Sequence, residues 1–192
     1  MKDAIAKFWR EFEILTPKLE DLRTADDPVY DEMLAALQKV DSDLYFEFCS
    51  SPGSNEFIVT ADGQKKLFPL VEMIVEEAPD MDDWEFFALK PKRGFPVTTR
   101  WEQVVVAIED VSVVPVFRET GEMGLWLYVQ GLCEANEGDI HNALLRALDV
   151  GLGERRFAEM VVATWVHPAS EAPESAFPLS ELDEYIDRME SK

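Results

Sequence analysis

The chain offers few side chains suited to nucleophilic or metal chemistry. It has two histidines, His141 and His167, and a serine, threonine or cysteine nucleophile normally needs a histidine base within hydrogen-bond reach. No serine lies in the Gly-x-Ser-x-Gly turn of a nucleophile elbow, and this includes the serine-rich residues 50–54. Asp139 and His141 lack the i, i+4 spacing that places two metal ligands on one helix face. We therefore predict no serine-hydrolase site and no metal site, and we interpret both histidines as surface residues at element ends.

Carboxylates are too abundant to mark a catalytic pair. Among 39 Asp and Glu residues, two will lie close enough to resemble a general acid and base by chance. The acidic cluster over residues 76–83 has no calcium-loop spacing. The glycines fit turns and helix ends, without a Walker or dinucleotide pattern. We predict no catalytic residues and no cofactor, and a hydrolase-type enzyme using carboxylates in a cleft between sheet and helices remains the alternative.

The charge balance bears on the class of partner. The 39 acidic residues face 18 Lys and Arg, so the formal net charge is -21. Such a field repels nucleic acids and anionic membranes and speeds encounter with basic proteins. An acidic surface that serves solubility alone is the favoured interpretation, and a basic protein is the candidate partner class; we predict no nucleic-acid and no membrane binding.

The cysteines and the apolar segments bear on the compartment. Cys49 and Cys133 form no CxxC or Cys-His spacing, which argues against a disulfide framework or a zinc site. The sequence after Met1 has no apolar core of signal-peptide type, and no long apolar span follows. We expect a reducing cytoplasm.

One segment gathers positive charge in this acidic chain. Residues 90–101 hold four basic residues and no acidic one, in a stretch that also contains proline, glycine and aromatic side chains. Such a loop can bind an acidic partner, or its cations can pair with the protein's own carboxylates. The candidate partner-contact loop consists of Lys90, Lys92, Arg93, Phe95, Arg100 and Trp101.

Apolar periodicity predicts an α+β fold in a single domain, residues 1–192. A 3.6-residue period from Ile5 to Leu22 predicts a first helix, with a kink or a new helix start at Thr16-Pro17. Asp26-Asp27-Pro28 predicts the start of a second helix. Residues 1–43 are therefore predicted to be an N-terminal helical extension.

The rest of the chain predicts the same order of elements twice. Both units, at residues 44–90 and 103–168, are predicted to contain a hairpin, a helix and a strand, and a C-terminal helix follows over 178–190. The predicted strands are 44–49, 56–61 and 84–89, then 111–117, 125–132 and 160–166. We expect a mainly antiparallel sheet with the helices packed on one face. Pro115 predicts an edge strand or a bulge, and residues 104–108 fit either a separate strand or the start of the next one.

Several short motifs resemble an uncharacterised bacterial family of small acidic cytoplasmic proteins, described as a domain of unknown function. The motifs occur in order along most of the chain: 8–12, 58–63, 68–72, Ala78-Pro79, Trp84 with Lys90-Pro91, and 152–154. The resemblance implies a cytoplasmic α+β fold and brings no established activity or catalytic residue. At the level of fold alone, the duplicated unit in an acidic chain is also similar to regulators of ribonuclease activity and to immunity proteins.

These observations favour a non-catalytic, cytoplasmic protein-binding or regulatory module with an acidic surface. An immunity-type inhibitor of a basic enzyme is a more specific form of this hypothesis. A further alternative is a homodimer that uses Phe8, Trp9 and Phe12 as an exposed aromatic contact.

Overall fold

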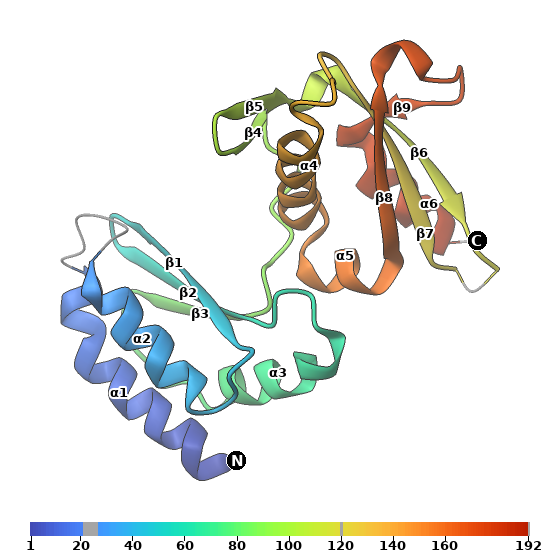
Figure 1. The fold of residues 1–192 in the computed structure, drawn as a ribbon. Coiled ribbons are helices and arrows are strands. Elements are labelled where there is room, and N and C mark those ends of the chain that lie inside the picture. Colours follow the sequence, from blue (N-terminus) through green and yellow to red (C-terminus); the bar gives the residue numbers. More distant parts are fainter. Residues whose placement is uncertain (21–26, 120, 192) are drawn as a thin grey trace. The chain divides into compact units, whose positions relative to one another are not determined.

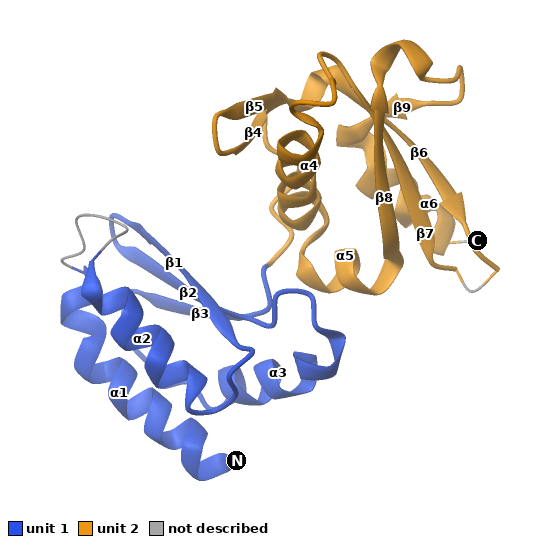
Figure 2. Cartoon of the chain, in the orientation of Figure 1, with its two compact units in different colours: residues 1–90 blue, residues 91–192 orange. Residues whose placement is uncertain are grey.

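The computed structural model describes residues 1–20, 27–119 and 121–191. It divides the chain into two compact units, residues 1–90 and 91–192 (Figure 2). This division coincides with the predicted end of the first hairpin-helix-strand unit. The single domain expected for residues 1–192 stays a prediction, and each unit is described by itself.

The first unit consists of a helical pair followed by a hairpin, a helix and a strand, as predicted (Figure 1). The sheet has the order β1-β2-β3, with β1 and β2 antiparallel and β3 parallel to β2. The elements are α1 (Lys2–Glu20), α2 (Pro28–Gln38), β1 (Tyr45–Ser51), β2 (Ser54–Thr60), α3 (Phe68–Glu76) and β3 (Trp84–Ala88).

Both N-terminal helices contain a proline, near the end of α1 and at the start of α2. Helix α1 continues through Thr16-Pro17, so no new helix starts there, which was one of the two predicted outcomes. Pro17 lies in the last turn, so the hydrogen bond that its missing N–H removes affects only the end of the helix. The Thr16 hydroxyl donates to the Phe12 carbonyl at 3.0 Å. Helix α2 begins as predicted, because Asp27 caps it by accepting a hydrogen bond from the Val29 amide. Leu22 and Asp26 lie outside the described residues.

The first unit closes over an aromatic core. Phe8, Trp9 and Phe12 are at most 5% exposed, and the rings of Phe12 and Phe57 lie 4.8 Å apart. The Trp9 indole N–H donates to the Ile74 carbonyl at 2.8 Å, which ties α1 to α3. The prediction that these three aromatics form an exposed dimer contact is therefore wrong: the period that suggested a surface stripe is the buried face of α1.

The first hairpin is tighter than its sequence suggested. Residues 50–55 were expected to be a loop, yet the strands pair up to Ser51 and Ser54, leaving only Pro52 and Gly53 in the turn. Gly53 has φ = +77°, which glycine adopts without a Cβ clash. The Ser50 hydroxyl also donates to the Asn55 side chain at 2.8 Å, so polar residues extend the ladder.

The second unit repeats the hairpin, helix and strand of the first. Its main sheet has the order β8-β7-β6-β9; β7 is antiparallel to β6 and parallel to β8. The elements are β4 (Thr98–Trp101), β5 (Val104–Ala107), β6 (Val111–Phe117), β7 (Met123–Val129), α4 (Glu137–Leu152), α5 (Glu154–Met160), β8 (Val161–Pro168), β9 (Phe177–Pro178) and α6 (Leu182–Glu190). The α+β fold class and the mostly antiparallel pairing are confirmed.

Several features of the second unit differ from expectation. The strands of the chain lie in three sheets where one was expected, and β4, α5 and β9 were not predicted. Residues 104–107 form a strand of their own, because they pair with β4 inside the basic segment. Pro115 sits on β6 beyond the two-residue pairing with β9, so it behaves as an edge residue, as predicted.

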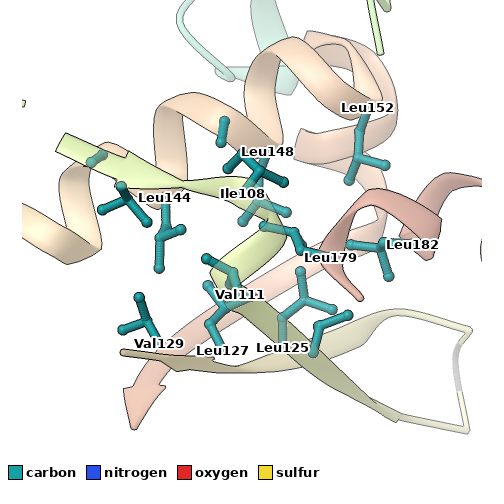
Figure 3. Packing of buried hydrophobic residues seen from close by; sticks show 14 of the residues in the cluster. Ile108, Val111, Leu125, Leu127, Val129, Leu144, Leu148, Leu152, Leu179 and Leu182 are labelled. Atoms are coloured by element: carbon teal, nitrogen blue, oxygen red, sulfur yellow. The ribbon is translucent and has the colours of Figure 1, made fainter. Parts of the chain in front are cut away.

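The core of the second unit lies on one face of its sheet. The odd-numbered residues Val113 of β6 and Leu125 and Leu127 of β7 are fully buried, whereas Pro115 and Phe117 of β6 are half-buried. Figure 3 shows Leu125 and Leu127 on the same side as Leu144 of α4 and Leu182 of α6. Because strand side chains alternate between faces, the even-numbered residues must point to the opposite side of the sheet.

Candidate functional site: an aromatic sheet face

The sheet face opposite α4 and α6 carries exposed aromatic and branched side chains. Trp126 of β7 is 42% exposed and Trp165 of β8 is 48% exposed, and the register pairs these two residues directly. Val116 of β6 and Val162 of β8 are 45% and 37% exposed. We call this surface the open face and define it as Val116, Arg118, Gly124, Trp126, Val162, Trp165 and His167, which together line a cavity of about 450 Å³.

Gly124 fixes the position of the Trp165 ring. A Cβ atom at residue 124 would lie 2.6 Å from Cζ3 of Trp165. Real Cβ atoms do not approach a neighbour so closely, so the ring can lie across β7 only because residue 124 is glycine. One wall of the cavity is therefore the Trp165 indole of β8, which occupies the space that a side chain at residue 124 of β7 would fill.

His167 forms the other end of the open face. Its ring centroid lies 5.9 Å from that of Trp126 and 5.4 Å from that of Tyr128. His167 Nδ1 lies 4.0 Å from a carboxylate oxygen of Glu171. His167 Nε2 is buried and has no hydrogen-bond partner among the described residues. A buried polar nitrogen without a partner is costly, so this end of the open face carries a local energetic penalty.

Charged groups stand at the two ends of the open face. Arg118 lies at the β6–β7 turn, and its guanidinium is 3.9 Å from the Glu122 carboxylate. Glu171, which follows β8, is 63% exposed at its side chain. The middle of the face is apolar and aromatic, with one Glu at each end.

The candidate partner-contact loop is largely engaged within its own unit. Lys90 pairs with Glu47 at 3.6 Å and with Asp62 at 3.7 Å in the first unit. In the second unit, Lys92 pairs with Asp183 at 2.6 Å. These contacts are the internal pairing that the sequence offered as the alternative to partner binding.

The other four residues of the loop are divided between core and surface. The Arg93 amide donates to the Val150 carbonyl at 3.0 Å. Phe95 packs against the core, 2.6 Å from where a Cβ of Gly151 would stand. Arg100 and Trp101 are exposed on β4, Trp101 by 40%. Within the second unit, Phe95 is therefore part of the core packing whereas Arg100 and Trp101 face solvent, and partner contact by the loop stays a prediction.

The two histidines are less exposed than expected. His141 is half-buried and its Nε2 lies 2.6 Å from the Thr164 hydroxyl, which links α4 to β8. Both lie near element ends, as predicted, and both are partly buried, because the helix and strand ends that carry them pack against neighbours. Within the described residues, no group of three or more His, Cys, Asp or Glu side chains is placed to hold a metal ion.

Two further cavities lie away from the open face. One of about 600 Å³ is lined by α6 and residue 191 and contains a single carboxylate, that of Asp187. The other, about 370 Å³, lies at α1 and α2, where Glu11 forms an ion pair with Lys39 at 2.8 Å. Neither cavity is a cleft between a sheet and helices, which is where the hydrolase alternative places its catalytic carboxylates.

Comparisons of the chain with protein-family models, with curated proteins and with solved structures gave no match. No helix of the described residues has the length and apolar character needed to cross a membrane. The open face and the charge of the chain are therefore the features from which a function can be inferred.

Proposed function

We propose that this chain is a non-catalytic, cytoplasmic protein-binding or regulatory module, and that the open face is its contact surface. The observation that carries the proposal is the pair of half-exposed tryptophans, Trp126 and Trp165, on a sheet face that α4 and α6 leave uncovered. Tryptophan is enriched among residues that dominate binding energy at protein interfaces.

Covering Trp126 and Trp165 with a protein partner is energetically favourable compared with leaving them exposed to water. Each Trp side chain has a large apolar area, and about half of it faces water on this surface. Covering such an area contributes roughly 25 cal/mol for each Å² buried, so two tryptophans can supply a central anchor for binding. The charge of -21 adds attraction to a basic protein and repulsion of nucleic acid.

The test is quantitative affinity capture from the native cell lysate with three baits. These are the wild-type chain, the variant Trp126→Ala/Trp165→Ala, and the control Trp101→Ala, which removes a 40% exposed tryptophan outside the open face. Far-UV circular dichroism establishes that all three are equally folded. We expect the amount of partner captured by the double variant to fall at least about tenfold, because interface hot spots contribute 2 kcal/mol or more each.

Equal capture by all three baits would contradict the open face as the contact surface. Turnover of a small-molecule substrate by the purified chain, abolished by one substitution in a cavity, would contradict the non-catalytic part of the proposal.

A further inference from the structure

We infer that the open face recognises a basic segment of the partner, with arginine or lysine side chains lying on Trp126 and Trp165. This inference rests on the proposed function and names the chemistry of the partner. Its supports are the aromatic walls of the cavity and the acidic groups at both ends of the face.

The aromatic walls suit a cationic side chain. An indole face carries negative electrostatic potential and attracts a guanidinium or ammonium group within about 6 Å, and tryptophan is the strongest of the aromatic residues in this role. Trp126 and Trp165 are paired across neighbouring strands and line one cavity. The stems of arginine and lysine also bury apolar surface against aromatic rings.

The charges around the face complement a basic segment. Glu122 and Glu171 stand at opposite ends, and the one cation of the face, Arg118, lies 3.9 Å from Glu122. The net charge of -21 opposes docking of a second copy of the chain on this surface. Charge complementarity therefore selects a basic partner over self-association.

The length of the face sets the size of the segment. From Gly124 to Tyr128 the strand advances four residues, roughly 13 Å at about 3.4 Å per residue. An extended segment of about four residues, or a helix of about nine at 1.5 Å per residue, spans this distance. A peptide of about twelve residues is thus long enough to test the inference.

The probes are four matched twelve-residue peptides. Each peptide has four variable positions separated by glycine and serine. These positions are all arginine in the first peptide, all lysine in the second, all citrulline, a neutral arginine isostere, in the third, and all glutamate in the fourth. They are titrated into the full-length chain labelled with ¹⁵N, and the five indole N–H signals are followed by NMR. Single Trp→Phe variants assign the signals.

We expect the arginine and lysine peptides to shift the signals of Trp126 and Trp165 but not that of Trp101. The variant Trp126→Ala/Trp165→Ala should weaken arginine-peptide binding by about 5- to 30-fold, the range for cation–π contacts of about 1–2 kcal/mol. The variant Glu122→Gln/Glu171→Gln should weaken it by up to about fivefold, with a smaller effect at high salt.

Three results would overturn the inference. The first is binding of the citrulline peptide as tight as that of the arginine peptide. The second is arginine-peptide binding that leaves the Trp126 and Trp165 signals unmoved. The third is a dimer in sedimentation velocity that the double tryptophan variant abolishes, since a second copy would then occupy the face. If the peptides fail while lysate capture still depends on the two tryptophans, the contact surface stands and only the partner chemistry is wrong.

Discussion

Replacing Gly124 by alanine should displace Trp165, and the cost of doing so can be worked out from the geometry. The new Cβ would lie 2.6 Å from Cζ3 of the ring, so the indole must move. Forcing extra volume into a packed site typically costs about 1–3 kcal/mol. Against this, alanine is about 0.5–1 kcal/mol better than glycine inside a strand. We expect Gly124→Ala to destabilise the second unit by roughly 0.5–2 kcal/mol.

The same substitution should have the opposite effect once the ring is gone. In a Trp165→Ala background, alanine at residue 124 meets no indole and should stabilise the unit by about 0.5–1 kcal/mol. The coupling energy between the two sites should therefore be about 1–3 kcal/mol, as found for residues in direct contact.

Native-state hydrogen exchange of the β7 amides measures this double-mutant cycle in the full-length chain, because it reports the stability of the second unit itself. Wild type, both single variants and the double variant are compared at one pH and temperature. A Gly124→Ala effect of the same sign and size in both backgrounds would refute the placement of Trp165 over Gly124, and with it the shape of the open face.

Three further predictions concern stability. Trp9→Phe should cost about 0.5–1.5 kcal/mol in urea unfolding, because it removes the 2.8 Å hydrogen bond to the Ile74 carbonyl, which keeps the Glu77 amide as a donor at 3.3 Å; an unchanged midpoint would contradict the role of that hydrogen bond. Burial lowers the pKa of Arg156, but its hydrogen bonds to α6 carboxylates outweigh this and raise the pKa overall. Arg156→Met should therefore destabilise the second unit by about 1–2 kcal/mol, and by less at high salt, because it removes the ion pairs to α6. A loss of stability that does not depend on salt would argue against the ion pairs. Burial, and to a smaller extent the charge of Cys49, raise the pKa of Tyr30 in the folded chain. The folded state therefore keeps the Tyr30 proton to a higher pH than the unfolded state does, and stability should fall as the pH rises above about 10. Tyr30→Phe should reduce this fall in melting curves between about pH 9 and 12, and identical curves for wild type and variant would contradict the prediction.

The order of elements was predictable because local patterns encode it. The 3.6-residue period of α1, the Asp27 cap of α2 and the two hairpin-helix-strand units all appear in the sequence and in the structure. What failed depends on distant partners. The basic segment contains β4, which becomes a strand only by pairing with β5, and the stripe of Phe8 and Phe12 is covered by a sheet far along the chain.

The open face was missed although a signal for it exists. On β7 the core residues Leu125 and Leu127 occupy odd positions, so the two-residue period places Trp126 on the opposite face, where Gly124 and Tyr128 are also buried. The same argument for Trp165 requires the register of β8 against β7, which contains an irregularity next to Gly124. Sequence periodicity gives the face of one strand, whereas the neighbours on that face follow from pairing between strands.

Hydroxyl-radical labelling of tryptophans, compared between the captured complex and the isolated chain, tests whether the open face is the contact surface. Three tryptophans are 40% or more exposed, namely Trp101, Trp126 and Trp165, so all three should be labelled in the isolated chain. The account predicts that the partner protects Trp126 and Trp165 and leaves Trp101 reactive. Undiminished labelling of Trp126 and Trp165 in the complex would show that the partner binds elsewhere and would contradict the open face as the contact surface.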